Sequence, residues 1–162
     1  QSIIDLACGL NPLSIPYLKL DINQLQYHAY DISITEIDLI HRYFNYLKSK
    51  NPTFIGTAEI RDIRDINELI TPQTSVSYPH SDIAFCFKIL DILDQNKGHK
   101  SSELLLDQIP SKYIVVSFAT KTISGKFMTA PKRRWMEWLC NRKGWKYTII
   151  KFGNELLYII QK

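Results

Sequence analysis

The sequence is poor in glycine, with six in 162 residues, and they do not form the G-x-G-x-x-G pattern. That pattern builds the phosphate cradle of dinucleotide sites, so its absence argues against NAD or ATP as a ligand. No apolar run approaches the roughly 18–20 residues that span a bilayer, and no signal-peptide pattern is present. The three cysteines, Cys8, Cys86 and Cys140, have no C-x-x-C spacing. The absence of that spacing argues against a structural metal, and it favours reduced thiols in the core of a cytoplasmic protein.

The size and charge of the chain indicate one soluble globular domain with a basic end. Of its 162 residues, 45% are hydrophobic and 22% are charged, which is enough for a sizeable core. Residues 1–118 carry 10 Lys and Arg against 14 Asp and Glu, whereas residues 119–162 carry 10 against 2. The net charges are therefore −4 and +8. This asymmetry favours a polyanion contact at one edge, although a solvated basic face is the alternative.

Short apolar segments alternate with helical patterns, as in a parallel sheet whose strands are joined by helices. We expect strands at 2–6, 26–30, 53–58, 81–87 and 113–118. Ser33, with Glu36 three residues later, forms a capping-box pattern for a helix that ends before Pro52. The apolar stripe of that helix is Ile34, Ile37, Ile40, Phe44 and Leu47. Further helices are expected at 89–94, 101–109 and 131–142, with polar loops at 64–80 and 119–130.

The chain closes with strands expected at 145–152 and 155–160, joined at Gly153-Asn154 in a tight hairpin. The predicted fold is therefore α/β: a doubly wound, mostly parallel seven-stranded sheet of the Rossmann-like type, ending in an antiparallel β-hairpin. Residues 1–162 are expected to form one domain.

The first twelve residues organise this prediction. The strand at 2–6 runs into three small residues, Ala7, Cys8 and Gly9, where the backbone must turn sharply. Asn11 tolerates a left-handed conformation, and Pro12 can occupy the first position of a helix. A strand followed by a small-residue turn and a helix presents backbone N–H groups at the carboxyl end of the strand, where such sheets bind ligands.

Charged residues stand at or just past the carboxyl ends of four expected strands: Asp5, Asp31, Asp62 and Lys88. An acidic residue that ends the second strand can accept hydrogen bonds from both hydroxyls of a ribose, and one after the third strand can accept from an adenine amino group. Each Asp alone would more often be a cap or turn residue. Together with the small-residue turn they favour a nucleoside-bearing cofactor, and S-adenosylmethionine has no phosphates that would need a glycine-rich cradle.

At these positions the sequence resembles a known family. The stretch 7–13 is similar to motif I of the aminoglycoside-resistance methyltransferases that modify a guanine N7 in 16S ribosomal RNA, a family of class I S-adenosylmethionine-dependent enzymes. The similarity continues, in order, through 30–32, 61–63, 82–90, 116–121, Gly125 and 153–160, and so covers nearly the whole chain.

The resemblance implies three groups of cofactor contacts. Those at the methionine end would come from Ala7, Cys8, Gly9 and Asn11, with Asp5 at the end of the preceding strand. Those at the ribose and adenine would come from Asp31, Ile32, Asp62 and Ile63. Those at the reacting end would come from Phe87, Lys88 and Leu90.

The chain departs from the family in two places. Residues 1–162 contain no counterpart of the family's N-terminal helical extension, which helps to grip the ribosomal subunit, and the start at Gln1 directly before a strand suggests a fragment. Ala119 stands where the family's Ser-Phe-x-Thr stretch has a proline.

The implied reaction needs no general base, because guanine N7 has an in-plane lone pair and no proton to remove. Catalysis would consist of aligning that nitrogen with the methyl group and excluding water. Lys88 either positions the target base, contacts the RNA backbone or only ends its strand. The four histidines are scattered and are expected to be surface or core residues.

The basic end supplies candidate RNA contacts around the exit of the fifth strand: Thr120, Lys121, Lys126, Lys132, Arg133 and Arg134. Trp135 and Trp138 are expected to pack on the sheet, with base stacking as the alternative. Phe118 or Phe127 is a hypothetical acceptor for a target base turned out of its stack.

The sequence therefore predicts a cytoplasmic, monomeric methyltransferase that acts on ribosomal RNA or the small ribosomal subunit, without a metal or a membrane. Two alternatives stay open. One is a methyltransferase of this fold with a tRNA or small-molecule substrate; the other is a non-catalytic RNA-binding relative.

Overall fold

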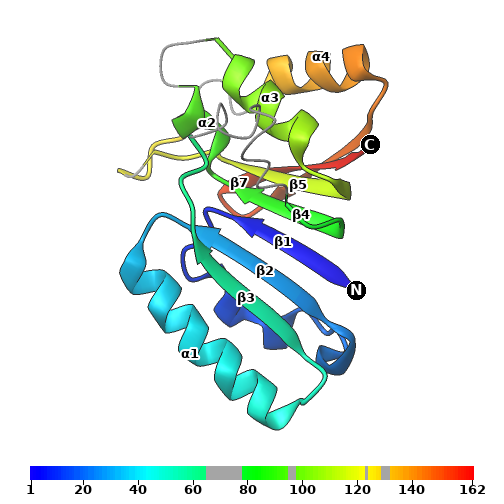
Figure 1. Ribbon diagram of the computed structural model, residues 1–162. Coiled ribbons are helices and arrows are strands. Elements are labelled where there is room, and N and C mark those ends of the chain that lie inside the picture. Colours follow the sequence, from blue (N-terminus) through cyan, green and yellow to red (C-terminus); the bar gives the residue numbers. More distant parts are fainter. Residues whose placement is uncertain (65–77, 95–97, 123, 129–131) are drawn as a thin grey trace.

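The computed structural model describes residues 1–64, 78–94, 98–122, 124–128 and 132–162. A seven-stranded sheet runs through it in the order β3-β2-β1-β4-β5-β7-β6 (Figure 1). The strands are β1 (Ser2–Leu6), β2 (Gln26–Asp31), β3 (Ile55–Ile60), β4 (Ser81–Phe87), β5 (Ser111–Ala119), β6 (Lys146–Phe152) and β7 (Glu155–Gln161). The first five pair in parallel, and β7 lies antiparallel between β5 and β6. This confirms the predicted fold class, including the closing hairpin.

Helices cover both faces of the sheet. The helices are η1 (Asn11–Tyr17) and η2 (Ile22–Gln24), both 3-10, and α1 (Ile34–Lys50), α2 (Leu90–Leu93), α3 (Lys100–Gln108) and α4 (Arg134–Lys143). One core cluster joins α1 and η1 to the β1–β3 half of the sheet, and a second joins α2, α3 and α4 to the opposite face. Alternate residues of one strand serve the two clusters: Ile3 belongs to the first, Ile4 to the second. The central strands are apolar on both faces for this reason.

Several predicted boundaries and exposures differ from the structure, and two of the differences have a clear physical reason. The fifth strand begins at Ser111 rather than Tyr113, and the third ends at Ile60 rather than Ala58. The third strand begins at Ile55 rather than Thr53, because Phe54 is buried against Phe44, with ring centroids 5.6 Å apart, before the chain pairs with β2. The sequence pattern predicts Ile34 in the apolar stripe, but this residue is 70% exposed because it is the first residue of α1 and lies one turn before the buried Ile37. The predicted Ser33 cap is confirmed: its hydroxyl accepts from the Glu36 N–H at 3.4 Å.

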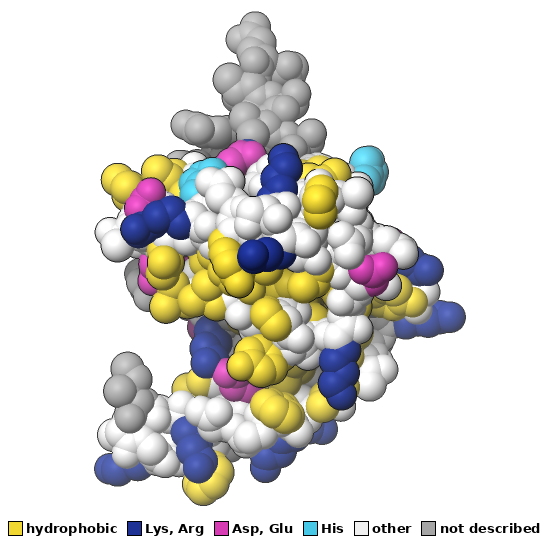
Figure 2. All heavy atoms as spheres, turned by 90° about the horizontal axis from the view of Figure 1, so that it is seen from below, with side chains coloured by type: hydrophobic (Ala, Val, Ile, Leu, Met, Phe, Trp, Pro, Cys, Tyr) yellow, Lys and Arg dark blue, Asp and Glu magenta, His cyan; other side chains and the backbone are white. Residues whose placement is uncertain are grey.

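Some expectations fall outside the described residues, namely most of the loop at 64–80 and the helix start at Pro131. Among the residues that the structure describes, no helix is long and apolar enough to cross a membrane. Hydrophobic side chains nevertheless remain on the surface, interleaved with Lys and Arg on the face that Figure 2 shows.

Candidate functional site

The turn after β1 is held against the end of β2. Ala7 and Gly9 both have left-handed backbones, with φ of 51° and 49°. The Cys8 N–H donates to the Tyr30 carbonyl at 3.0 Å, and the Gly9 N–H donates to the Asp31 carboxylate at 2.8 Å. Nothing lies within 4 Å of the position where a Cβ on Gly9 would stand, so the left-handed backbone alone favours glycine there.

Asp5, near the end of β1, holds the residues around this turn through two side-chain hydrogen bonds. Its side chain is 1% exposed, and one carboxylate oxygen accepts from the Tyr27 hydroxyl at 2.7 Å and from the Asn11 side-chain amide at 2.8 Å. Burial raises the pKa of Asp5 to about 7, with a smaller contribution from the charge of Asp31, while the two hydrogen bonds oppose the shift. Asp5 therefore positions Asn11 and the turn rather than lining the adjacent pocket.

Asp31 ends β2 with both carboxylate oxygens engaged by backbone. One accepts from Gly9 and the other from the Ser33 N–H at 2.9 Å. An ionised carboxylate has about four lone-pair sites, so two backbone bonds leave room for further donors such as hydroxyls. Asp31 also borders a pocket, so the remaining lone pairs of its carboxylate can accept hydrogen bonds from a ligand bound there.

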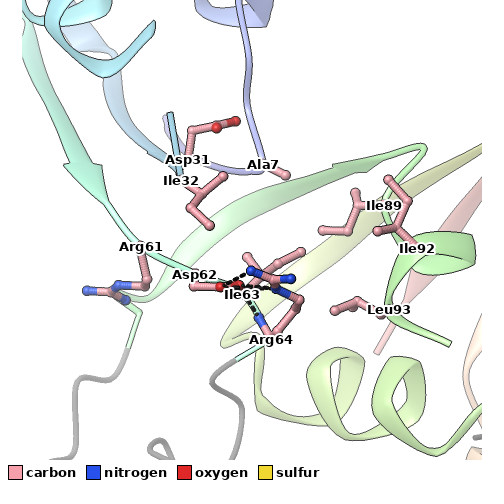
Figure 3. Close-up of a pocket in the computed structure, with 10 residues that line it drawn as sticks. All are labelled: Ala7, Asp31, Ile32, Arg61, Asp62, Ile63, Arg64, Ile89, Ile92 and Leu93. Atoms are coloured by element: carbon pink, nitrogen blue, oxygen red, sulfur yellow. Dashed lines mark hydrogen bonds and ion pairs between the residues drawn. The ribbon is translucent and has the colours of Figure 1, made fainter. Parts of the chain in front are cut away.

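The pocket has a volume of about 280 Å³, near the lower end of the roughly 300–1,000 Å³ typical of small-molecule sites. Figure 3 shows its lining residues, which come from the ends of β1, β2 and β3 and from the start of the segment that contains α2: Ala7, Asp31, Ile32, Arg61, Asp62, Ile63, Arg64, Ile89, Ile92 and Leu93. Five of these are branched aliphatic side chains. The pocket thus combines apolar walls with a carboxylate at the end of β2.

Charged groups form one side of the pocket. The Asp62 carboxylate accepts several hydrogen bonds from Arg64, the shortest at 2.6 Å (Figure 3), and these bonds lower the pKa of Asp62. The Arg61 guanidinium lies over the Tyr30 ring, 4.4 Å from its centroid, and over the Tyr78 ring at 4.9 Å. In this structure Asp62 is thus engaged with Arg64, and its contact with an adenine amino group stays a prediction.

The three residues predicted to lie at the reacting end of the cofactor, Phe87, Lys88 and Leu90, differ in their exposure to solvent. Phe87 stacks on Phe85 with centroids 5.0 Å apart, whereas Leu90 is fully buried in the core and does not line the pocket. Lys88 has a left-handed backbone with φ of 60°, and its Nζ lies 2.6 Å from a carboxylate oxygen of Glu155 at the start of β7. Residues missed from the sequence include Ile89, Ile92 and Leu93 in the pocket wall, whose only signal was an apolar run after β4, and Glu155.

The predicted RNA contacts differ in accessibility. Lys126, Lys132 and Arg134 are exposed, and Lys121 is partly exposed. Thr120 is 4% exposed, and its N–H donates to the Asn154 carbonyl at 2.8 Å, so it is a structural residue here.

Arg133, which the sequence predicts as a phosphate contact, is engaged within the protein in this structure, and its contact with RNA stays a prediction. Its guanidinium binds the Asp91 carboxylate at 2.6 Å and lies 4.9 Å from the centroid of the Phe118 ring. Only 14% of the Arg133 side chain is exposed. Arg133 therefore joins α2 to the segment before α4.

The aromatic residues singled out in the sequence also differ in exposure. Trp135 packs against the core, as expected, and its ring also stacks on His99 with centroids 4.0 Å apart. Trp138 is 63% exposed, so the expectation that it packs on the sheet is wrong, and base stacking by Trp138 stays a prediction. Phe118 is 1% exposed and has no free face for a base, which leaves Phe127, 72% exposed, as the accessible member of that pair. All three cysteines are buried, and none forms a disulfide. Within the described ranges, no group of His, Cys, Asp and Glu side chains could hold a metal ion.

The strand order, the antiparallel β7 and a pocket at the carboxyl ends of β1–β4 define a class I methyltransferase fold. Comparison with solved structures agrees: the 16S rRNA methylase RmtB matches 99% of this chain and 55% of its own at 21% identity, with a TM-score of 0.65. The 16S rRNA methylase ArmA matches 99% of this chain and 74% of its own at 28% identity, with a TM-score of 0.61.

Residues 1–159 match the family model described as ribosomal RNA methyltransferase (FmrO), so the chain belongs to that family. This confirms the resemblance found in the sequence. A 16S rRNA (guanine(1405)-N(7))-methyltransferase of Frankia casuarinae is 28% identical over 98% of this chain and 51% of its own length. The chain thus spans about half the length of the curated relatives it matches.

Proposed function

We propose that this protein transfers a methyl group from S-adenosylmethionine to a guanine N7 of small-subunit ribosomal RNA. The observation that carries the proposal is the small-residue turn bound to Asp31 beside an apolar pocket, in a chain of the FmrO family. Relatives named as 16S rRNA (guanine(1405)-N(7))-methyltransferases support the substrate. Residues 1–162 would form the methyltransferase domain.

The residues present fit this cofactor. An adenine ring suits walls made of Ile32, Ile63 and Ile89, and ribose hydroxyls suit the remaining lone pairs of Asp31. The turn at Ala7–Gly9 offers a close backbone approach to the methionine end, because Gly9 leaves open space. When bound, the cofactor supplies an electrophilic methyl group on a sulfonium.

The protein's own residues then have a modest task. Guanine N7 needs no deprotonation, so the site must orient the base and exclude water. Lys88 directly follows β4, the strand that pairs with β1, and Glu155 holds its side chain in place. From this position its ammonium can contact the base or a neighbouring phosphate. We assign Lys88 a positioning role.

The partner in this proposal is the ribosomal RNA or the assembled small subunit, and the net charge of +8 in residues 119–162 favours such a polyanion. The protein would act as a monomer in the cytoplasm, where the subunits are. The resemblance to aminoglycoside-resistance enzymes extends the proposal to protection of the ribosome from these antibiotics.

The first test is calorimetric titration of S-adenosylmethionine and S-adenosylhomocysteine. We expect saturable binding that Asp31→Ala abolishes and Asp38→Ala retains. Asp38 is a matched control, because it is a carboxylate on α1 in an exposed pair with Arg42 at 3.0 Å. Equal affinity in wild type and Asp31→Ala would contradict the assigned site.

The second test follows labelled methyl groups into purified small subunits and into the isolated RNA. Borohydride reduction followed by aniline cleavage marks N7-methylguanosine in the RNA chain. We expect cleavage at one guanine after treatment with the protein. Methyl transfer without such cleavage would show a different target atom, and cofactor binding without any transfer would favour a non-catalytic RNA-binding protein.

A further inference from the structure

Two phenylalanines stand exposed at the carboxyl edge of the sheet. Phe127 is 72% exposed in the segment that follows β5, and Phe152, the last residue of β6, is 76% exposed. Figure 1 shows the segment after β5, in yellow, extending beyond the carboxyl ends of the central strands. Exposure of two large apolar rings on the same edge suits a site that binds flat apolar surfaces.

The two rings belong to segments that are hydrogen-bonded to each other. The segment after β5 folds back on itself through a bridge between Lys121 and Phe127, and the Met128 N–H donates to the Thr120 carbonyl at 2.9 Å. Thr120 in turn donates its N–H to Asn154, in the turn between β6 and β7. Phe152 pairs across that turn with Glu155. These backbone contacts fix the positions of the two segments that carry the phenylalanines.

The same contacts reach the proposed reaction centre. Glu155, the strand partner of Phe152, forms the ion pair with Lys88 at the end of β4. β4 pairs directly with β1, which leads into the turn at Ala7–Gly9. Both phenylalanines therefore lie at the same carboxyl edge of the sheet as this turn, on the side formed by β5, β7 and β6.

Cations accompany the first of these rings. The Lys121 ammonium lies 4.6 Å from the centroid of the Phe127 ring, and Lys126, one residue before Phe127, is exposed. Interleaved aromatic and basic side chains are the pattern with which proteins bind unpaired nucleotides, because bases stack on the rings while the cations neutralise phosphates. A regular duplex keeps its bases stacked inside and cannot offer them to these rings.

We propose that Phe127 and Phe152 form a stacking platform that binds unpaired nucleotides next to the target guanine. The platform rests on the proposed function for its substrate, and it specifies that function further: the RNA is recognised by bases that are free to stack, and Lys121 and Lys126 hold the adjoining phosphates.

The test measures binding of a fluorescent, unstructured RNA oligonucleotide and of a matched RNA duplex at fixed salt concentration, without cofactor. We expect Phe127→Ala and Phe152→Ala each to weaken binding of the unpaired RNA about 5- to 100-fold, as loss of a stacking residue does elsewhere. Duplex affinity should change less than about twofold, because duplex binding depends mainly on phosphate contacts. Phe127→Tyr and Phe152→Tyr should retain binding, since they keep the ring.

Tyr46→Ala is the control. Tyr46 is also an exposed aromatic, with 59% of its surface accessible, but it lies on α1, which covers the β1–β3 half of the sheet. We expect it to leave the affinity for unpaired RNA unchanged. Lys121→Gln should lower the dependence of binding on salt, whereas the phenylalanine variants should not.

Wild-type affinity for unpaired RNA in both alanine variants would overturn the platform, as would an equal loss in Tyr46→Ala or an equal loss with the duplex. Melting curves and the tyrosine variants separate these results from misfolding. Because this assay uses no cofactor, it is independent of the calorimetric test: loss of the platform with intact cofactor binding leaves the proposed enzyme standing, and the reverse result leaves an RNA-binding protein.

Discussion

The backbone N–H of Gly9 donates to the carboxylate of Asp31 at 2.8 Å, and this bond ties the turn after β1 to the end of β2. The two residues are 22 positions apart in the chain but belong to neighbouring parallel strands. Since Asp31 is also bonded to Ser33, its carboxylate has a fixed orientation before any ligand arrives. The proposed ribose contact is therefore preorganised.

Gly9→Ala tests this arrangement. A left-handed conformation costs a non-glycine residue about 1–2 kcal/mol, so we expect the free energy of unfolding to fall by about that amount. Cofactor affinity should fall as well, because the added methyl group enters the open space beside the turn. Gly144→Ala is the control: Gly144 has φ of 71° and open space around it, but caps the end of α4. It should lose similar stability in urea unfolding and retain cofactor affinity.

Asp5 predicts a dependence of stability on pH. Burial raises the pKa of Asp5 to about 7 in the folded state, above the ordinary value of 3.8 for this side chain. The folded protein therefore binds this proton more tightly than the unfolded chain, and the contribution of Asp5 to stability is full below about pH 4 and is lost as pH rises toward 7. Asp5→Asn cannot ionise, so it should remove this fall.

Urea unfolding of both proteins between pH 4 and 8 measures the effect. The free energy of unfolding of Asp5→Asn, relative to the wild type, should increase as pH rises through that window. Parallel pH profiles for the two proteins would show that Asp5 does not titrate there.

Lys88 should matter more for activity than for stability. Its side chain is 56% exposed, so its ion pair with Glu155 is expected to contribute less than about 1 kcal/mol. We expect Lys88→Met to leave the melting temperature nearly unchanged while methyl transfer to the small subunit falls. Cofactor affinity by calorimetry should be retained. Wild-type transfer by this variant would mean that Lys88 only ends its strand.

Arg133 and Arg134 are neighbours with opposite expected phenotypes. Arg133→Ala removes charge-assisted hydrogen bonds to Asp91 and the contact with Phe118, so it should lower the free energy of unfolding by about 1–3 kcal/mol. Arg134→Ala, at an exposed position, should change stability by less than about 0.5 kcal/mol and weaken RNA binding instead. Chemical unfolding and a salt titration of RNA binding distinguish the two, and equal stability loss in both would refute the assignment.

Local patterns in the sequence were sufficient for much of the fold. Small residues at Ala7–Gly9 predicted the turn, and a serine before an apolar stripe predicted the start of α1, because backbone sterics and hydrogen bonding act over a few residues. Asp31 and Asp62 were placed at the correct edge since parallel strands bring their carboxyl ends together. Their contacts with a cofactor stay predictions.

The accessibility of side chains was harder to predict. Phe118 and Phe127 are nine residues apart and chemically identical, yet one is buried and the other is 72% exposed. Composition and spacing do not distinguish them, because burial depends on which helix covers each face of a strand. The prediction that Trp138 packs on the sheet is wrong for the same reason: its spacing from Trp135 does not show which face of the helix is covered.

Sequence patterns were sufficient for the alternation of strands and helices, the turn after the first strand and the family, since each depends on neighbouring residues or on ordered motifs. The charges that remain available for a ligand could not be predicted in this way, because they depend on which side chains meet in the folded domain. Arg133 is bound to Asp91, 42 residues away, and Lys88 to Glu155, on a different strand. Ion pairs form when two groups come within about 4 Å, and for residues so far apart in the chain that distance is set by packing of the whole domain.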